Sequence, residues 1–346
     1  MVAPLHWGLG HATRCIPIIR ELLAANYRVM LASDGAALLL LRKEFPQLPY
    51  IELPSYDITY PKKGFFFKWK LMMRMPKVRR AVKAERKMVH RMVDKGKIQG
   101  IISDNRFGVY SYKVPSVFIT HQLNVLSGTT SFFSSKAHRK IIQKYDQCWV
   151  PDVAGPNNLS GKLGHSADSY PDLRYIGPLS RMTPKDVPKK YDYLVLLSGP
   201  EPQRTMLEVK MMEIMGGSDK EVLLVRGVVK EKASYLKKGN LTLVDFMQTE
   251  ELEQAINQSE LVISRSGYTT IMDLAAMEKA AFFIPTPGQY EQKYLARQLR
   301  GQGLVPCCKQ DEFNLRKLEQ LPLYKGLKSI QSNVDLRQLF TLFEGE

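Results

Sequence analysis

The stretch LVISRSGYTTIMDLAAMEKAAFFIPTPGQYEQKYLA (residues 261–296) alternates two short apolar runs with two longer segments of helical spacing. The apolar runs, 261–264 and 281–284, predict buried strands, because each is brief and is bounded by Gly, Pro or charged residues. Residues 268–278 and 289–300 predict the helices that follow them. Alternation of strand and helix is typical of a parallel sheet with helices on its faces.

The same alternation extends over the rest of the chain. Further strands are predicted at 2–5, 27–33, 98–103, 116–120, 148–150, 193–197, 222–225 and 241–244. Further helices are predicted at 17–25, 203–215 and 250–257. The expected fold class is therefore α/β, with two tandem doubly wound, Rossmann-like domains that face each other across a cleft. In such sheets ligands bind at the carboxyl ends of the strands.

Domain boundaries are expected where the composition changes. Residues 1–155 form the first domain, and residues 156–190, rich in Gly, Pro, Asn, Asp and Ser, form a linker. Residues 191–332 form the second domain. Residues 333–346 are expected to form a C-terminal helix that packs back on the first domain.

The chain of 346 residues carries a net charge of +16, and the positive charge is concentrated. Residues 62–97 contain fourteen Lys and Arg against two acidic residues. Such a surface suits nucleic acid or an anionic membrane. No apolar run approaches the roughly 18 residues that span a bilayer, and no signal peptide is visible. The four cysteines show neither metal spacing nor a disulfide pattern, so we expect reduced thiols and an intracellular protein.

Two functions compete for the stretch LHWGLGHATR (residues 5–14). Gly8 and Gly10 fit part of a dinucleotide fingerprint, whose third glycine is absent. Asp34, after the second strand, would then hold a ribose. In the other interpretation, the glycines form a tight turn that presents His11 to a substrate. A histidine that merely caps the following helix is the third alternative.

Three turns of the second half lie between a predicted strand and a predicted helix. They read SGPEPQR (198–204), SRSGYTTIMD (264–273) and PTPGQYEQKY (285–294). Backbone N–H groups at such turns bind phosphate, with the helix dipole behind them. The candidate donor contacts are Ser198, Gly199, Arg204, Ser266, Gly267, Asp273, Glu291 and Gln292. Asp273 alone is equally consistent with a solvated helix residue.

The pattern over 264–296 resembles the nucleotide-sugar half of the GT-B glycosyltransferases of family 28. GLGHATRCIP (8–17) occupies the place of that family's Gly-rich loop with its histidine, and THQLNVLSG (120–128) is similar to its His-Glu-Gln-Asn segment. The resemblance implies GT-B architecture, a UDP-sugar as donor and no metal or other cofactor. The chain has Gln122 where the family has Glu.

The resemblance also implies residue roles. His11 would be the general base, Asp273 would hold the ribose, and Gln292 the donor sugar. The diphosphate would face Ser198, Gly199, Ser266 and Gly267. Phe246 and Met247 would line the pocket of the base. The acceptor side would contain Gly8, Gly10, His121 and Asn124, although His121 is also consistent with packing.

The implied chemistry is physically sound. An unperturbed histidine has a pKa of about 6.5, so it is able to accept a proton at neutral pH. General-base assistance is worth roughly 10²–10⁴-fold. Asp104, at the end of a predicted strand, is a second catalytic acid, an orienting partner of His11 or a strand-end cap.

The segment KKGFFFKWKLMMRMPKVRR (residues 62–80) mixes aromatic, methionine and basic residues. This mixture suits a membrane interface, where basic side chains meet anionic lipid and apolar ones are buried. The residues expected to face the membrane are Phe65, Phe66, Phe67, Lys68, Trp69, Lys70 and Arg74. One alternative is an apolar core with a solvated basic face. Nucleic acid is another, although no recognition module accompanies the segment.

The sequence therefore predicts an inverting glycosyltransferase that moves a sugar from a UDP-sugar to a membrane-associated, lipid-linked acceptor. We expect a cytoplasmic protein attached to the inner face of the cell membrane, with a role in the cell envelope. A UDP-sugar epimerase of the same fold and a catalytically inactive nucleotide-sugar-binding protein are the alternatives. The donor sugar, the acceptor and the oligomeric state stay open.

Overall fold

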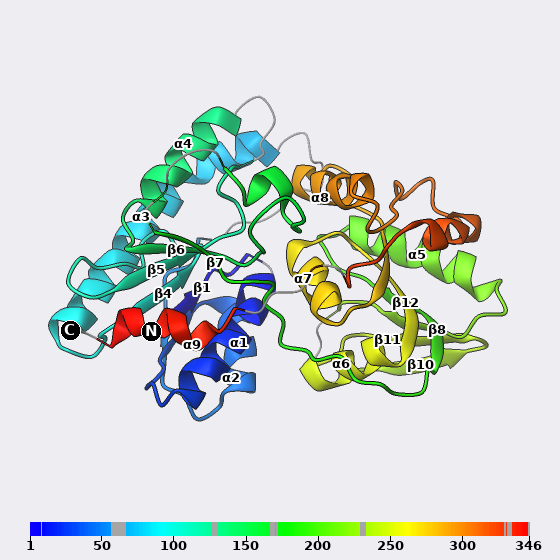
Figure 1. Ribbon diagram of the computed structural model, residues 1–346, viewed down its shortest axis with the longest axis horizontal. Coiled ribbons are helices and arrows are strands. Elements are labelled where there is room, and N and C mark those ends of the chain that lie inside the picture. The colour runs from blue at the N-terminus through cyan, green and yellow to red at the C-terminus, as the bar shows by residue number, and fades with distance from the viewer. Residues whose placement is uncertain are drawn as a thin grey trace. The chain divides into compact units, whose positions relative to one another are not determined.

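The alternating strands and helices of the sequence form two largely parallel sheets (Figure 1). The computed structural model describes residues 1–7, 9–56, 67–125, 131–166, 170, 172–228, 233–328, 330 and 334–344. Within the helices at 67–94 and 131–142, side chains are described from Met75 and Ser134 onward.

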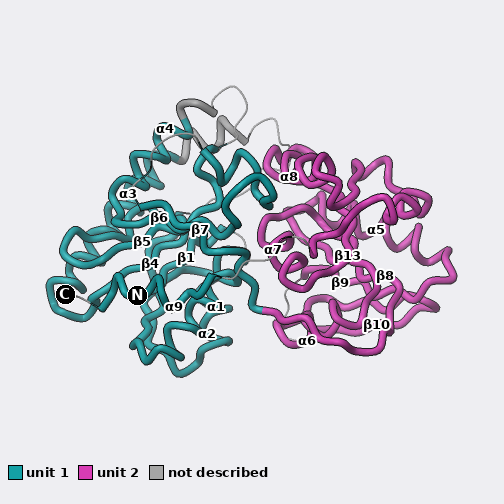
Figure 2. The backbone as a smooth tube through the Cα atoms, in the orientation of Figure 1, with its two compact units in different colours: residues 1–181, 332–346 teal, residues 182–331 magenta. Residues whose placement is uncertain are grey.

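The chain divides into two compact units, shown in different colours in Figure 2. Unit 1 comprises Met1–Arg181 and Ser332–Glu346, and unit 2 comprises Met182–Gln331. The expected fold class, two tandem Rossmann-like domains, is confirmed by this pair of sheets.

Unit 1 contains a seven-stranded sheet with the order β3-β2-β1-β4-β5-β6-β7, in which each neighbouring pair is parallel. The strands are β1 (Val2–Pro4), β2 (Leu31–Ser33), β3 (Tyr50–Glu52), β4 (Ile101–Asp104), β5 (Ser116–Ile119), β6 (Gln147–Val150) and β7 (Leu173–Tyr175). Strand order reverses between β1 and β4. This reversal is the point at which doubly wound sheets bind ligands.

The helices of unit 1 cover both faces of its sheet, with α1 and α2 on one face and α3 and α4 on the other (Figure 1). They are α1 (Gly10–Ala24), α2 (Gly35–Glu44), α3 (Phe67–Asp94), α4 (Ser131–Ile142), α9 (Leu336–Leu339) and the short 3₁₀ helices η3 (Gly161–Leu163) and η5 (Phe340–Phe343). Right-handed crossovers require this arrangement, because the chain changes direction along the sheet after β3. Buried valines of α3 pack on β1 and β4.

Helix α1 begins earlier than the sequence predicts. The prediction starts the helix at Pro17, whereas the structure starts it at Gly10 and accommodates Pro17 inside it. Ala12, Cys15 and Ile19 are fully buried at helical spacing, so packing against the sheet favours the longer helix. As a result Gly10 and His11 lie in the first turn of a helix.

Residues 156–190 do not form a simple linker. Strand β7 lies within them and pairs with β6, so residues up to Arg181 belong to unit 1. Unit 2 begins at Met182. Within it, the backbone N–H of Lys185 donates to Asn257 Oδ1 at 2.9 Å. Pairing at the sheet edge decides the structure here, because Gly and Pro content predicts only the turns.

The C-terminal residues of the chain belong to unit 1. Phe340 is buried, and its ring lies 5.9 Å from that of Tyr27 and 6.4 Å from that of Trp149. The Tyr27 hydroxyl donates to the Phe340 carbonyl at 3.0 Å.

Unit 2 contains a six-stranded sheet with the order β10-β11-β9-β8-β12-β13, in which only the edge strand β10 is antiparallel to its neighbour. The strands are β8 (Tyr191–Leu196), β9 (Val222–Val225), β10 (Tyr235–Lys238), β11 (Leu241–Val244), β12 (Ser259–Ser264) and β13 (Ala280–Phe283). The helices are α5 (Gln203–Gly216), α6 (Thr249–Asn257), α7 (Tyr268–Ala276), α8 (Tyr290–Gly301) and the 3₁₀ helix η4 (Leu315–Leu323). The strand order reverses between β8 and β12.

Candidate functional site

The reversal point of the unit 1 sheet brings a carboxylate and a histidine together. Asp104 is the last residue of β4 and is fully buried. His11 lies in the first turn of α1, which follows β1, the neighbour of β4. His11 Nδ1 lies 2.8 Å from Asp104 Oδ1, and the imidazole side chain is 14% exposed. Of the roles predicted for Asp104, the contact matches that of an orienting partner.

Arg14 completes this cluster, one turn of α1 beyond His11. Its Nε lies 2.5 Å from Asp104 Oδ2, and its Nη2 donates to Asp104 Oδ1. Its Nη1 lies 3.0 Å from Nδ1 of His121, which follows β5. The guanidinium is 1% exposed. The sequence analysis did not single out Arg14, although its position three residues after His11 on a helix places both on one face.

The charge state of Asp104 follows from these contacts. Burial by itself would raise the pKa of the carboxyl, but the Arg14 charge and the nearby His11 hold that pKa well below its usual range. Asp104 is therefore ionised, and its Oδ1 is within hydrogen-bond distance of His11 Nδ1. A histidine that is held by a carboxylate in this way is able to act as a general base.

The other residues predicted for the acceptor side do not join this cluster in the described structure. Gly8 lies outside the described residues. Gly10 is the first residue of α1 and does not form a turn before it. The Asn124 amide nitrogen donates to the carbonyls of Lys162 at 2.7 Å and His165 at 3.2 Å, so this side chain ties two loops of unit 1 together. Gln122 is partly buried, and its backbone N–H donates to Thr120.

Asp34, the ribose contact of the dinucleotide alternative, takes part in a second buried cluster of unit 1. Its carboxylate accepts from Arg106, and His6 Nδ1 lies 3.2 Å from it. Arg106 also pairs with Glu85 of α3, to which the Tyr56 hydroxyl donates at 2.7 Å. Arg106 and Glu85 are both fully buried. Asp34 is thus held by protein groups, which argues against the dinucleotide alternative.

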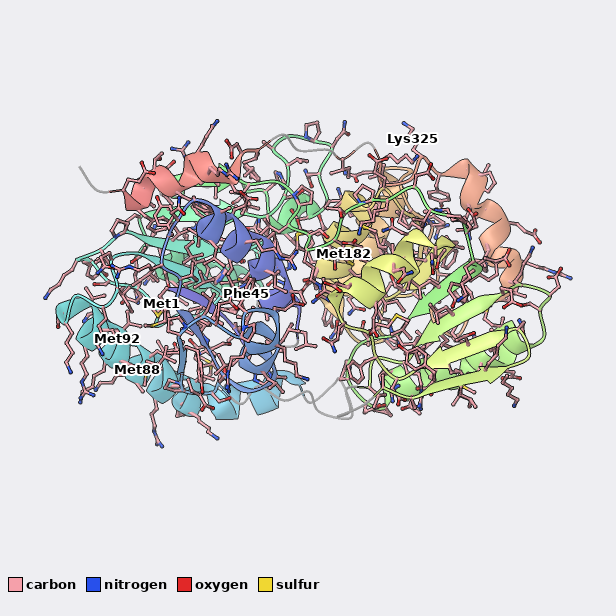
Figure 3. The ribbon with its side chains drawn as sticks, turned by 90° about the horizontal axis from the view of Figure 1, so that it is seen from below. Met1, Phe45, Met88, Met92, Met182 and Lys325 are labelled. Carbon is pink, nitrogen blue, oxygen red and sulfur yellow. The ribbon has the colours of Figure 1, made fainter. Side chains whose placement is uncertain are left out.

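Part of the predicted membrane-facing segment falls outside the description. Phe65 and Phe66 lie outside the described residues, and so do the side chains of Phe67, Lys68, Trp69, Lys70 and Arg74 within α3. The described part of α3 continues the basic character of the segment. Its exposed residues include Lys77, Arg79, Arg80, Lys83, Arg86, Lys87 and Arg91. Nitrogen-tipped side chains extend outward from this helix around Met88 and Met92 (Figure 3).

The reversal point of the unit 2 sheet is built from small residues. Ser198 and Gly199 follow β8 and are exposed. Gly199 has φ of +104°, a conformation that favours glycine. On the neighbouring strand, Ser266 and Gly267 follow β12, and Gly267 caps the N-terminus of α7. The predicted turns therefore lie side by side at the carboxyl edge of one sheet.

Gln292 and Thr286 join the third predicted turn to this edge. The Ser266 hydroxyl donates to the Gln292 carbonyl at 2.8 Å, and the backbone N–H of Thr286 donates to Gln292 Oε1 at 2.8 Å. Thr286 Oγ1 is buried and has no hydrogen-bond partner in the described structure. A Cβ added to Gly199 would lie 3.6 Å from this oxygen. The sequence analysis did not single out Thr286.

Arg204 does not fit its predicted role as a diphosphate contact. Its Nε and Nη2 donate to Glu201, its Nη1 donates to Glu208 at 2.5 Å and to the Arg226 carbonyl at 3.1 Å, and its Nη2 also reaches Thr205 at 2.9 Å. All five N–H groups are therefore engaged within the protein. Arg204 holds the start of α5 in place.

The remaining predicted donor contacts are found around the same edge. Phe246 and Met247 follow β11 and are half-buried. They come directly after Asp245, a buried carboxylate that accepts from Arg226 at 2.8 Å and from Ser234. Asp273 lies in the second turn of α7, and Glu291 lies in the first turn of α8. Both are partly buried.

Among the described residues, no group of three His, Cys, Asp or Glu side chains is arranged to hold a metal ion. No helix within the same residues is long and apolar enough to cross a membrane.

Comparison with known proteins identifies the second half of the chain. Residues 194–334 match the glycosyltransferase family 28 C-terminal domain. A curated relative from Pasteurella multocida (strain Pm70) is 25% identical over 207 residues, which are 58% of this chain and 54% of that protein. It is named UDP-N-acetylglucosamine--N-acetylmuramyl-(pentapeptide) pyrophosphoryl-undecaprenol N-acetylglucosamine transferase. The chain thus spans about half the length of this relative.

Other comparisons cover more of the chain. An uncharacterized glycosyltransferase from Methanosarcina mazei is 23% identical over 328 residues, which are 86% of this chain and 82% of that protein. The crystal structure of Acinetobacter baumannii MurG superposes with a TM-score of 0.57 at 15% identity and covers 99% of this chain and 98% of that chain. The chain therefore has the fold of the GT-B glycosyltransferases, and its residues 194–334 match the model of the glycosyltransferase family 28 C-terminal domain.

Proposed function

We propose that this protein is an inverting glycosyltransferase that transfers a sugar from a UDP-sugar to a membrane-associated, lipid-linked acceptor. The observation that carries the proposal is the match of residues 194–334 to the family 28 C-terminal domain. The name of the Pasteurella relative supports the two substrate classes, because it specifies a UDP-sugar and a pyrophosphoryl-undecaprenol compound.

In the proposed reaction His11 is the general base. Its Nε2 takes the proton of the acceptor hydroxyl while the hydroxyl oxygen forms a bond to the anomeric carbon of the donor. The bond between that carbon and the phosphate oxygen breaks, and UDP leaves with the electron pair. Attack from the side opposite UDP inverts the anomeric configuration. Asp104 would stabilise the imidazolium that forms, because its Oδ1 lies 2.8 Å from His11 Nδ1.

Unit 2 would bind the donor through backbone N–H groups rather than through cationic side chains. The turns at Ser198-Gly199 and Ser266-Gly267 would hold the diphosphate, with the N-terminus of α7 behind it. Phe246 and Met247 would line the pocket of the base, Asp273 would hold the ribose, and Glu291 and Gln292 would contact the sugar. The proposal requires neither a metal ion nor another cofactor.

Unit 1 would place the enzyme on an anionic membrane. Helix α3 supports this part of the proposal, because its described solvent-facing side is dominated by Lys and Arg. Each basic residue close to an anionic leaflet contributes about 1 kcal/mol. The protein would then work in the cytoplasm at the inner face of the cell membrane, on a lipid-linked acceptor of the cell envelope.

The test begins with the thermal stability of the whole chain against a panel of nucleotides and nucleotide sugars. A ligand at 100 times its Kd adds about 2.7 kcal/mol to the free energy of unfolding. We expect stabilisation by UDP and by one UDP-sugar. That sugar is then incubated with the protein and total lipid extract, and the label is expected in the lipid phase with inverted configuration.

The same experiment separates the alternatives. Stabilisation without turnover, in the presence of lipid extract, indicates an inactive nucleotide-sugar-binding protein, for which Gln122 is the sequence observation. A changed UDP-sugar without acceptor indicates an epimerase. Stabilisation by NAD, or by no nucleotide, contradicts the proposal.

A further inference from the structure

Arg14 lies at the centre of the unit 1 cluster and contacts both of its histidines. Its Nη1 lies 3.0 Å from His121 Nδ1, and its Nη2 lies 2.9 Å from His11 Nδ1. Its Nε and Nη2 also bind the two oxygens of Asp104. A guanidinium has five N–H donors, has no acceptor and keeps its proton in proteins. The histidine nitrogens that face Arg14 therefore face a group that can only donate a hydrogen bond.

For His121 the consequence is a defined tautomer. Because Arg14 only donates, the Nδ1 that faces it must carry a lone pair, and the proton of the neutral ring must then be on Nε2. If Nδ1 were protonated, two N–H donors would face each other, one from His121 and one from the guanidinium. Water could not easily separate them, because His121 is only 7% exposed. The arrangement keeps His121 neutral, with Nδ1 as acceptor.

For His11 the opposite tautomer follows. Its Nδ1 faces both a donor, Arg14 Nη2, and an acceptor, Asp104 Oδ1, at 2.9 and 2.8 Å. A lone pair on Nδ1 would oppose the ionised carboxylate oxygen, whereas Nδ1–H donates a charge-assisted hydrogen bond to it. Arg14 Nη2 still has a hydrogen-bond acceptor in this state, because it donates to Asp104 Oδ1. The lone pair of His11 is therefore on Nε2.

We propose that Arg14 is a positioning residue that fixes His11 and His121 in opposite tautomers, so that His11 Nε2 is the proton acceptor of this pair. Arg14 also donates to both oxygens of Asp104, so the negative charge next to His11 is balanced by the guanidinium. The reaction that uses the proton acceptor rests on the proposed function. The tautomers do not, and they are measurable without substrate.

The surrounding groups are compatible with this assignment. Arg14 contacts both rings, and Asp104 contacts that of His11. Cys15 Sγ lies 3.7 Å from Asp104 Oδ2, and burial raises the pKa of this thiol well above its usual range, so it is uncharged. His138 of α4 is close to His121, and burial lowers the pKa of His138 to about 4, so it is neutral at pH 7.

The first test is ¹⁵N NMR of the whole chain, labelled at its six histidines, at pH 7. His11→Gln and His121→Gln assign the two rings by loss of their signals. We expect the proton on Nδ1 in His11 and on Nε2 in His121. A proton on Nδ1 of His121, an imidazolium at His121, or a proton on Nε2 of His11 overturns the proposal. This result is independent of whether any UDP-sugar is turned over.

The second test uses two variants of Arg14. Arg14→Lys keeps a positive charge for Asp104 but has no planar fork to reach His121, so His121 is expected to show both tautomers. Arg14→Met removes the charge as well. The ascending limb of its pH–rate profile is expected to move to higher pH by about 1–3 units, because an unopposed carboxylate favours the imidazolium of His11. Arg14→Lys is expected to retain most of the wild-type profile.

A matched control lies on the same helix. Arg20 of α1 is 49% exposed and pairs with Glu44 at 3.5 Å, so Arg20→Met is expected to change neither the tautomers nor the pH profile. A merely structural Arg14 would give a smaller yield of folded protein, with wild-type tautomers and an unshifted profile in the folded fraction. That outcome contradicts the positioning role, even where the glycosyltransferase activity itself is found.

Discussion

The reversal points of the two sheets carry opposite kinds of groups. In unit 1 the carboxyl edge holds a buried, fully paired set of charged and titratable side chains, Asp104, Arg14 and His11. In unit 2 the corresponding edge holds Ser198, Gly199 and their neighbours, which offer backbone N–H groups and hydroxyls. Both edges are preferred ligand sites, yet they suit different tasks. Fixed side chains suit proton transfer, whereas an open backbone turn suits an anion that arrives with the substrate.

The arginines near the turns of unit 2 show the same difference between the two sheets. Arg204 and Arg265 lie next to the predicted diphosphate turns, but both are engaged by the protein. Arg265 is 1% exposed and binds the carbonyls of Ile284 at 3.0 Å and Gln203 at 3.0 Å. In unit 2 buried charge holds the loops in place, and in unit 1 it surrounds the proposed base. Substitution of Arg204 should therefore affect stability, whereas substitution of His11 should affect chemistry.

The largest expected effect is that of His11→Ala on turnover. Loss of the general base is expected to lower kcat by about 10²–10⁴-fold, with little change in Tm, because the ring is partly exposed. Steady-state kinetics with the UDP-sugar identified by the ligand panel measure the effect. His6→Ala is the control, since His6 follows the same strand but contacts Asp34. An equal loss in both variants would remove the special role of His11.

Arg204→Met tests the structural role of charge in unit 2. The substitution leaves the buried Glu208 with Arg226 as its remaining cation, so the free energy of unfolding is expected to fall by about 1–3 kcal/mol. Urea unfolding measures this loss, and calorimetry measures Kd for UDP in the folded protein, which is expected to stay unchanged. Arg316→Met, at an exposed position, is the control. Normal stability with tenfold weaker UDP binding would restore the diphosphate role that the sequence predicted.

Glu85 of unit 1 is expected to make stability depend on pH. Burial raises the pKa of its carboxyl from 4.5 to about 7. Between these values the folded state holds a proton that the unfolded state has lost, so stability falls as the pH rises through this window. The loss is at most about 1.4 kcal/mol per unit of pKa difference.

Amide exchange within α3 between pH 4.5 and 7.5 measures this slope. Glu85→Gln is expected to flatten it, because the amide does not titrate. Glu213→Gln, which changes an exposed carboxylate of α5 in unit 2, is the control and is expected to leave the slope intact. A slope of the opposite sign would mean that the contacts of Arg106 and Tyr56 outweigh burial.

Gly199→Ala tests the open turn of unit 2. A side chain at φ of +104° is strained, at a cost of about 1–3 kcal/mol, and the added methyl also crowds the proposed diphosphate position. We expect Kd for UDP to rise about tenfold, measured by calorimetry. Gly155→Ala is the control, because its φ of +91° is also well outside the ordinary range and nothing lies within 4 Å of its added Cβ. Equal weakening in both variants would indicate a general loss of stability.

The last prediction concerns the basic face of α3. Arg79 and Arg80 are exposed on this helix, and each is expected to contribute about 1 kcal/mol to binding an anionic membrane. The double variant Arg79→Gln/Arg80→Gln should therefore co-sediment less with vesicles that contain phosphatidylglycerol. Neutral vesicles and a variant with Lys317→Gln, exposed in unit 2, are the controls. Equal binding of the double variant and the wild type would contradict the membrane role of this face.

Elements that a few neighbouring residues define could be predicted from the sequence, whereas elements that depend on distant residues could not. Strands β9 and β11 are buried runs of four residues between turn signals, and both were predicted to the residue. Strands β7 and β10 were not predicted. They are short and contain no fully buried residue, so they have no apolar pattern, and pairing with β6 and β11 defines them. Helix α1 was predicted too short because Pro17 resembles a helix start.

The sequence by itself determined the α/β class, the turns after β8 and β12 and the candidate residues His11 and Asp104. Each of these signals lies within about ten consecutive residues, where periodicity and turn chemistry act. Only the tertiary structure decided which charges act together. Arg14 and Asp104 are ninety positions apart, and their pairing arises because β1 and β4 are neighbours in the sheet. The same holds for Arg204, whose engagement with Glu208 and the Arg226 carbonyl depends on packing that no local pattern reports.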